Sequence, residues 1–261
     1  MPAIRQEPIR PPSMFLALTE PQRAFCELSS LSAAAPLLGC APHGDGHPVL
    51  VLPGFVTSDR STAILRRFLS GLGYDAHGWE LGRNLGPRAI GWEGERLIDR
   101  LHEVHDGEKV SLVGWSLGGV MARELARRHP EMIRQVITLG SPFTGDPRAS
   151  TVSRAYEAIT GDRIDSIHLR ERLAESAKPP PVPSTAIFSK GDGVVPWRNC
   201  IEPCSDHTDN IEVYGSHCGL GVNPAVLYAV ADRLALPEGK WEPFERKGWR
   251  AAVYPFSGHL Q

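Results

Sequence analysis

Short apolar runs alternate with amphipathic segments along most of this chain, and this alternation limits the possible folds more than any other feature. Residues 48–53, Pro-Val-Leu-Val-Leu-Pro, have the continuous apolar character of a strand buried on both faces of a parallel sheet. Further strands are predicted at 74–79, 109–113, 133–139, 184–189 and 211–214, and helices at 61–72, 93–105, 117–129 and 224–234. The pattern predicts an α/β fold with a doubly wound, mainly parallel sheet of about six strands.

The segments at the two ends of the chain do not follow the alternation. Residues 1–46 are rich in Pro, Ala and Ser, and we expect an N-terminal arm with one helix from about 21 to 35. Residues 237–261 carry several aromatic side chains, which favours a C-terminal extension packed on the body of the protein. The main domain is therefore predicted to comprise residues 47–236.

One insertion interrupts the main domain. Residues 143–183 lie between the fourth and fifth predicted strands and include two expected short helices, at 151–160 and 165–177. A segment in this place would overhang the carboxyl ends of the strands. We expect it to form a small helical cap.

Charge and hydropathy exclude several classes of partner. A formal net charge of −2 gives no electrostatic reason to expect nucleic acid or an anionic membrane surface as a partner. No apolar run approaches the roughly 20 residues of a membrane-spanning helix. The apolar stretch at 14–18 is also shorter than that of an export signal, so a cytoplasmic location is expected.

The cysteines indicate reduced thiols. The chain has five cysteines, an odd number, and is large enough to fold without disulfides, which fits a reducing compartment. A disulfide between two of Cys200, Cys204 and Cys218 is expected only if the protein is exported. Zinc is not expected, because Cys200, Cys204 and His207 match no common structural-zinc spacing. No P-loop or dinucleotide motif is present, so no metal and no other cofactor is predicted. The five are Cys26, Cys40, Cys200, Cys204 and Cys218.

A pentapeptide between a predicted strand and a predicted helix carries the first chemical signal. Gly114-Trp-Ser-Leu-Gly118 has the form G-x-S-x-G, follows the strand at 109–113 and leads into the helix at 117–129. In this context the pattern predicts a nucleophile elbow, a sharp turn that lifts the Ser116 hydroxyl above the edge of the sheet. The alternative is an ordinary glycine-rich turn between a strand and a helix.

A base must take the proton of a serine nucleophile, because the hydroxyl alone is weakly nucleophilic near neutral pH. Catalytic groups in a doubly wound sheet gather beyond the carboxyl ends of the strands. His217 follows the predicted strand at 211–214 and is the expected base, with His207 as the alternative.

By the same argument, the acid that orients the base should follow the preceding strand. Asp192 stands directly after the strand at 184–189 and can accept the Nδ1 proton of His217. Asp206 and Asp209 are weaker alternatives, and Asp192 in a plain Asp-Gly turn is the ordinary interpretation. The chain order Ser, Asp, His matches the order of triads on this fold.

Five sequence blocks, in their order along the chain, resemble those of bacterial α/β hydrolases of the esterase and lipase type, and within these the small lipases related to the GPI inositol-deacylase-like group. The likeness spans about residues 49–236, and it implies an oxyanion hole made by the backbone N–H groups of Leu117 and Phe55. One departure is Pro53-Gly54, where the lipase loop usually has His-Gly. The blocks are Val51-Leu-Pro-Gly-Phe55, Gly114-Trp-Ser-Leu-Gly-Gly119, Thr138-Leu-Gly-Ser-Pro142, Ser189-Lys-Gly-Asp-Gly-Val-Val-Pro-Trp197 and Gly215-Ser-His-Cys-Gly-Leu220.

The triad and the resemblance together predict a serine hydrolase that cleaves carboxylic esters through an acyl-enzyme intermediate. Trp115, Phe143 and Trp197 are expected beside the substrate, and an apolar pocket there would suit a small-molecule or lipid ester with an aliphatic acyl chain. Rim packing is the alternative role for these aromatics. An acyltransferase or thioesterase on the same triad is the second hypothesis, and a non-catalytic binding protein of this fold the third.

Overall fold

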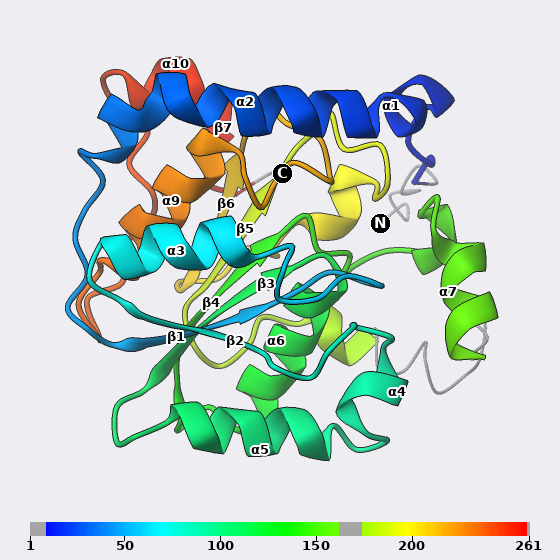
Figure 1. Ribbon diagram of the computed structural model, residues 1–261, viewed down its shortest axis with the longest axis horizontal. Coiled ribbons are helices and arrows are strands. Elements are labelled where there is room, and N and C mark those ends of the chain that lie inside the picture. Colours follow the sequence, from blue (N-terminus) through cyan, green and yellow to red (C-terminus); the bar gives the residue numbers. More distant parts are fainter. Residues whose placement is uncertain (1–8, 162–173, 260–261) are drawn as a thin grey trace, which may run out of the picture.

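The computed structural model describes residues 9–161 and 174–259 and has a single seven-stranded sheet at its centre (Figure 1). The strand order is β2-β1-β3-β4-β5-β6-β7, in which the first six strands run parallel and β7 runs antiparallel to β6. The bounds are β1 Pro48–Leu52, β2 Asp75–Gly78, β3 Val110–Trp115, β4 Ile133–Leu139, β5 Ser184–Phe188, β6 Thr208–Glu212 and β7 Phe256–Ser257. The predicted doubly wound α/β fold is confirmed.

The sheet has one strand more than the sequence pattern predicted. The C-terminal extension supplies β7, a strand too short for a hydrophobic pattern to reveal. The sixth strand begins at Thr208 instead of 211, because its polar residues are paired within the protein. Asp209 accepts a hydrogen bond from the Phe244 N–H (2.7 Å), and Asn210 exchanges two with the backbone of Glu202.

Helices cover both faces of the sheet, which explains why its strands are apolar along their whole length. On one face, α3 (Ala63–Gly71) and α9 (Pro224–Leu234) pack against Val49 and Val51 of β1. On the other face, α5 (Glu95–Val104) and α6 (Leu117–Arg128) pack against Leu50 and Leu52. The short helix α4, Pro87–Ile90, was not anticipated by the sequence pattern.

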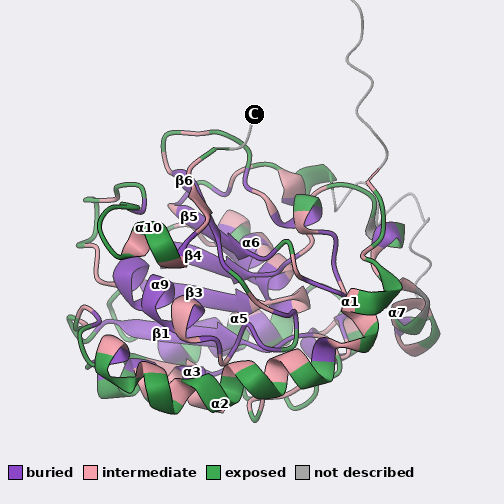
Figure 2. Ribbon diagram, turned by 90° about the horizontal axis from the view of Figure 1, so that it is seen from above, coloured by how far each residue is buried: buried purple, intermediate pink, exposed green. Residues whose placement is uncertain are grey.

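The N-terminal arm forms two helices, α1 (Met14–Leu18) and α2 (Glu20–Leu38), where one helix from 21 to 35 was expected. Ser13 caps α1 by accepting the Leu16 N–H. The second helix lies along α9 on the outside of the molecule, with much of its outer side exposed (Figures 1 and 2). The arm thereby adds a further layer over one face of the sheet.

The insertion and the extension contribute short elements. Within the insertion, η1 spans Pro147–Ala149 and α7 spans Ser153–Thr160, whereas the helix expected at 165–177 lies mostly outside the described residues. The 3-10 helix η2, Trp197–Cys200, follows β5. The extension forms α10, Arg250–Val253, and buries Tyr254, whose hydroxyl donates to the Ala225 carbonyl (2.9 Å).

A helix that crosses a membrane must be both long and apolar. None of the helices in residues 9–161 and 174–259 combines the length and the apolar character that a bilayer crossing requires.

Candidate active site

Ser116 occupies a strained turn between β3 and α6. Its backbone has φ 53° and ψ −121°, a region that residues with a side chain rarely adopt. The Ser116 N–H donates to the Leu139 carbonyl of β4 (2.8 Å), and its side chain makes no capping bond to α6. The turn therefore has the strand-to-helix form expected of a nucleophile elbow and leaves the hydroxyl available.

Close backbone packing explains the glycines that flank Ser116. A Cβ on Gly118 would lie 2.5 Å from the Leu52 carbonyl oxygen of the neighbouring strand. A Cβ on Gly114 would lie 2.5 Å from the Gly119 nitrogen. Because real side chains do not approach backbone atoms so closely, the turn can form only with glycine at these positions.

The loop after β1 lies against the elbow. A Cβ on Gly54 would be 3.4 Å from the Ser116 Cβ, and Phe55 lines the same pocket as Ser116 and Leu117. In the described part of the chain, the Phe55 N–H donates no hydrogen bond to a protein group, and the Leu117 N–H has no partner in its own helix. These two amides have the character of oxyanion donors.

Asn84 holds this loop in place, a role that the sequence analysis missed. Its fully buried side chain donates to the Pro53 carbonyl (2.8 Å), and its backbone carbonyl accepts the Val56 N–H (2.8 Å). Val56 has φ 56°, which a β-branched residue adopts only under constraint. The strained loop is therefore stabilised by a buried amide more than 25 residues further along the chain.

The predicted acid and base are in contact. Asp192 Oδ2 and His217 Nδ1 lie 2.6 Å apart, and both side chains are almost fully buried. The other oxygen, Asp192 Oδ1, accepts the N–H groups of Val194 (2.8 Å) and Val195 (2.7 Å), which fixes the carboxylate. His217 Nδ1 thus carries the proton that Asp192 accepts, and Nε2 remains to act as a base.

The charge around His217 favours its protonated form. Burial by itself lowers the pKa of this imidazole, but the Asp192 carboxylate, through its charge and its hydrogen bond, and the Glu20 carboxylate outweigh burial. The pKa of His217 is consequently raised. An imidazolium formed during catalysis would be stabilised by the same charges.

Two contacts connect the acid-base pair with the elbow. Trp115, which directly precedes Ser116, donates from Nε1 to the His217 carbonyl (3.2 Å). Gly140 directly follows Leu139, whose carbonyl accepts the Ser116 N–H. A Cβ on Gly140 would lie 3.2 Å from Asp192 Oδ2 and 3.3 Å from His217 Nδ1. Ser116, Asp192 and His217 therefore lie at the same, carboxyl edge of the central strands.

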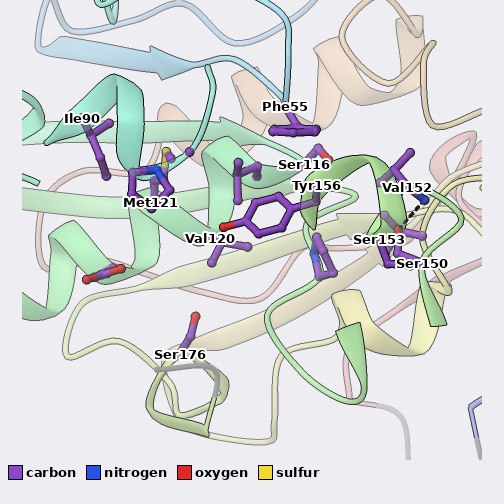
Figure 3. A pocket seen from close by; sticks show the side chains of 16 residues that line it. Phe55, Ile90, Ser116, Val120, Met121, Ser150, Val152, Ser153, Tyr156 and Ser176 are labelled. Atoms are coloured by element: carbon purple, nitrogen blue, oxygen red, sulfur yellow. Dashed lines mark hydrogen bonds between the residues drawn. The ribbon is translucent and has the colours of Figure 1, made fainter. Parts of the chain in front are cut away.

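An apolar pocket opens beside Ser116 (Figure 3). The Tyr156 ring of α7 lies across it and packs on Phe55, with ring centroids 5.3 Å apart. From Ser116 the pocket extends along one face of α6 toward Ile90 (Figure 3). Its apolar lining comprises Phe55, Pro87, Ile90, Leu117, Val120, Met121, Pro142, Val152, Tyr156 and Val195.

The three aromatics predicted beside the substrate are absent from the described lining of the pocket at Ser116. Phe143 is fully buried beneath the guanidinium of Arg123, 3.7 Å from its ring centroid. Trp197 stacks on Phe188, with centroids 5.7 Å apart, and Trp115 packs beside His217. In the described residues, none of the three lines the pocket at Ser116.

Two carboxylates of α2 contact the loops that carry the acid and the base. Glu20, only 4% exposed, accepts the N–H groups of Gly193, His217 and Cys218, and Glu27 accepts the Ser216 N–H. The seven-residue spacing that puts both on one helix face was the only signal in the sequence. It is a weak one, because acidic residues of a helix usually face solvent.

The cysteines are all free in the structure, and the Cys218 thiol next to His217 has a raised pKa. Burial, together with the neighbouring Glu20 carboxylate, raises the pKa of Cys218 to about 12, so its thiolate is scarce near neutral pH. Within the described ranges, no cluster of three or more His, Cys, Asp or Glu side chains is arranged to hold a metal ion.

Comparison with known families agrees with this architecture. The sequence profile of the family described as alpha/beta hydrolase fold matches residues 52–163, which include the elbow. Together with the order of the strands, this match shows that the chain has the α/β-hydrolase fold. A 47-residue stretch is 43% identical to the biotin biosynthesis bifunctional protein BioHC of Teredinibacter turnerae and covers 18% of this chain but only 8% of that protein.

Solved structures with the same fold include several lipolytic enzymes. Aspergillus fumigatus lipase B aligns with a TM-score of 0.58 at 18% identity, over 77% of this chain and 55% of that one. The monoacylglycerol lipase of Paleococcus ferrophilus aligns with a TM-score of 0.51 at 17% identity, over 71% and 96%. Est1E of Butyrivibrio proteoclasticus, solved with ferulic acid, aligns with a TM-score of 0.52 at 12% identity, over 74% and 90%. At these identities the likeness establishes the fold alone.

Proposed function

We propose that this protein is a serine esterase that hydrolyses carboxylic esters with an aliphatic acyl chain. One observation carries the proposal: Ser116 lies on a strained elbow at an apolar pocket, and the preceding Trp115 contacts His217, which forms a buried 2.6 Å hydrogen bond with Asp192. Lipolytic enzymes among the structural neighbours support the same class of reaction.

The proposed reaction has two halves. His217 Nε2 takes the proton of the Ser116 hydroxyl as Oγ attacks the ester carbonyl, and the Leu117 and Phe55 N–H groups bind the developing oxyanion. His217 then gives this proton to the leaving alcohol, which completes the acyl-enzyme. Water, activated by the same imidazole, releases the acid and restores Ser116.

The shape of the pocket favours an acyl chain of medium length. Its lining along α6 comes from Leu117, Val120, Met121 and Glu124, the spacing of one helix face. From Ser116 to Glu124, eight residues further along the chain, the helix rises by about 12 Å. Because this surface is apolar almost to its end, it offers a chain hydrophobic contact and few polar partners.

Hydrolysis of p-nitrophenyl esters from acetate to palmitate tests the proposal. Wild-type protein is expected to hydrolyse them with a maximum at intermediate chain length, and Ser116→Ala to lose the activity. Ser70→Ala, at an exposed position of α3, is the matched control. A wild-type protein inactive on every ester, or a Ser116→Ala variant that keeps its rate, would refute the esterase proposal; activity on acyl thioesters alone would favour a thioesterase.

A second variant tests the acyl site separately from the triad. Val120→Trp adds a bulky side chain to the face of α6 that lines the pocket. It should lower the rate on long esters relative to acetate, because the pocket would be blocked beyond the first turn of α6. An unchanged chain-length profile would place the acyl chain elsewhere.

A further inference from the structure

The N-terminal arm contacts the loops of the acid and the base through one carboxylate. Glu20 Oε1 accepts the Gly193 N–H (2.8 Å) from the acid loop and the His217 N–H (3.0 Å) from the base loop. Glu20 Oε2 accepts the Cys218 N–H (2.8 Å). A single side chain from outside the region matched by the family profile therefore joins the two loops.

Neighbouring residues of α2 extend this contact. Arg23 donates to the Gly191 carbonyl (2.6 Å) and to Glu20 (2.8 Å). Glu27, two helical turns after Glu20, accepts hydrogen bonds from the Ser216 N–H (2.7 Å) and from the side-chain amide of Asn223 (3.0 Å). Both loops are thus hydrogen-bonded along one face of a single helix.

The glycines of the two loops fit the arm closely. A Cβ on Gly193 would lie 2.5 Å from the Leu16 carbonyl oxygen of α1, and one on Gly219 would lie 2.5 Å from the Glu27 Cδ. Neither glycine has a positive φ, so the turn itself does not require glycine there. The close approach of the arm explains why glycine occupies both positions. The two loops and the arm therefore pack tightly against each other.

We propose that Glu20 is a positioning residue for the acid-base pair, and this inference rests on the esterase function proposed above. By accepting N–H groups from both loops, Glu20 fixes the distance between them and so keeps Asp192 in contact with His217 Nδ1. It also places a second negative charge beside the imidazole. The arm is then part of the catalytic apparatus, although it lies outside the hydrolase core.

The charge of Glu20 should appear in the pH dependence of the reaction. The titratable or charged groups facing His217 are Asp192 from the loop after β5, Glu20 and Arg23 from α2, and its neighbour Cys218. Three backbone N–H groups and Arg23 lower the pKa of Glu20 in spite of its burial, so this group is ionised near neutral pH. Loss of its charge would lower the pKa of His217, and the acid limb of the rate profile would move to lower pH.

The variants Glu20→Gln and Glu20→Asp separate the effect of the carboxylate charge from the effect of the side-chain length. In Glu20→Gln the amide turns an NH₂ group toward a backbone N–H, so kcat should fall roughly 10- to 100-fold with little change in KM. Because the amide carries no charge, the acid limb of the rate profile should also shift to lower pH. Glu20→Asp keeps the charge but is one methylene shorter, so kcat should fall while the acid limb stays in place. Glu242→Gln, on the exposed part of the C-terminal extension, is the matched control.

The experiment combines ester kinetics, active-site titration with a fluorophosphonate, and NMR titration of the His217 Nδ1 proton. Wild-type kcat per titrated site and an unshifted acid limb in Glu20→Gln would overturn the proposal. A smaller titratable fraction with unchanged kcat per site would indicate a purely structural role and overturn it also. If Glu20→Gln does not fold, a folded Glu20→Asp with wild-type kcat would be the refuting result.

The NMR readout keeps the two proposals distinct. If wild-type protein hydrolyses no ester, the esterase proposal fails, but the titration of His217 still decides the role of Glu20. A pKa of His217 that is lower in Glu20→Gln than in wild type would support the positioning role, and an equal pKa would refute it.

Discussion

Arg123 offers the sharpest test of what holds the nucleophile helix in place. Its side chain is fully buried on α6, pairs with the equally buried Glu202, and donates to the carbonyls of Ser176 (3.1 Å) and Lys178 (2.9 Å). The guanidinium thereby joins α6 to the end of the cap insertion and to the segment before β6.

Arg123→Met removes the charge and keeps an apolar side chain of similar length. The Glu202 carboxylate then retains one hydrogen bond, from the Ser184 hydroxyl (2.5 Å) to Oε1, while Oε2 already lacks a partner among the described residues. A buried charge left without its counter-ion costs about 3–5 kcal/mol. For a chain of this size the loss corresponds to a fall in Tm of roughly 6–20 °C.

Urea unfolding followed by tryptophan fluorescence measures this loss. Adding Glu202→Gln to Arg123→Met should recover part of it, because the uncompensated charge is then gone. Glu202 in Arg123→Met should also have a raised pKa in the folded state, so the free energy of unfolding of this variant should increase as the pH falls. A loss below about 1 kcal/mol, or a double variant no more stable than Arg123→Met, would refute the reasoning.

Three further predictions concern the proposed catalytic reaction. Gly118→Ala should abolish both fluorophosphonate labelling and ester hydrolysis, because its Cβ would lie 2.5 Å from the Leu52 oxygen; normal labelling would contradict the tight elbow. Asn84→Ala should lower kcat roughly 10- to 100-fold by releasing the Phe55 loop, and an unchanged kcat in steady-state assays would count against this amide as its support. In wild type, kcat/KM should fall as the pH drops through a value above about 6.5, the ordinary pKa of histidine, because His217 must be neutral to act as a base. An acid limb below that value would show that the surrounding carboxylates do not act as described.

The parts of the candidate site that could be predicted from the sequence depend on short motifs and on the order of strands and helices. The elbow could be located because Gly114 and Gly118 flank a serine between a strand and a helix. Asp192 and His217 could be selected because the carboxyl ends of parallel strands meet at one edge of the sheet. Each of these inferences needs only the order of elements along the chain.

The remaining features depend on tertiary packing, which local patterns do not encode. Glu20 resembles any acidic residue at the start of a helix until the arm is docked. Phe143 was expected beside the substrate because it lies in a loop near the site, whereas it packs under Arg123. β7 pairs through two residues only, so it has no hydrophobic period to detect.

The position of Glu20 in the chain also has a consequence for synthesis. The arm is made before the strands of the sheet, and its partners, residues 193, 217 and 218, follow 173 to 198 residues after Glu20. At about 5–20 residues per second, α2 must wait on the order of 10–40 s for the base loop to appear. In the later part of that interval a nascent chain would contain the arm and the elbow without the base, so the proposed activity would arise only after His217 has been added.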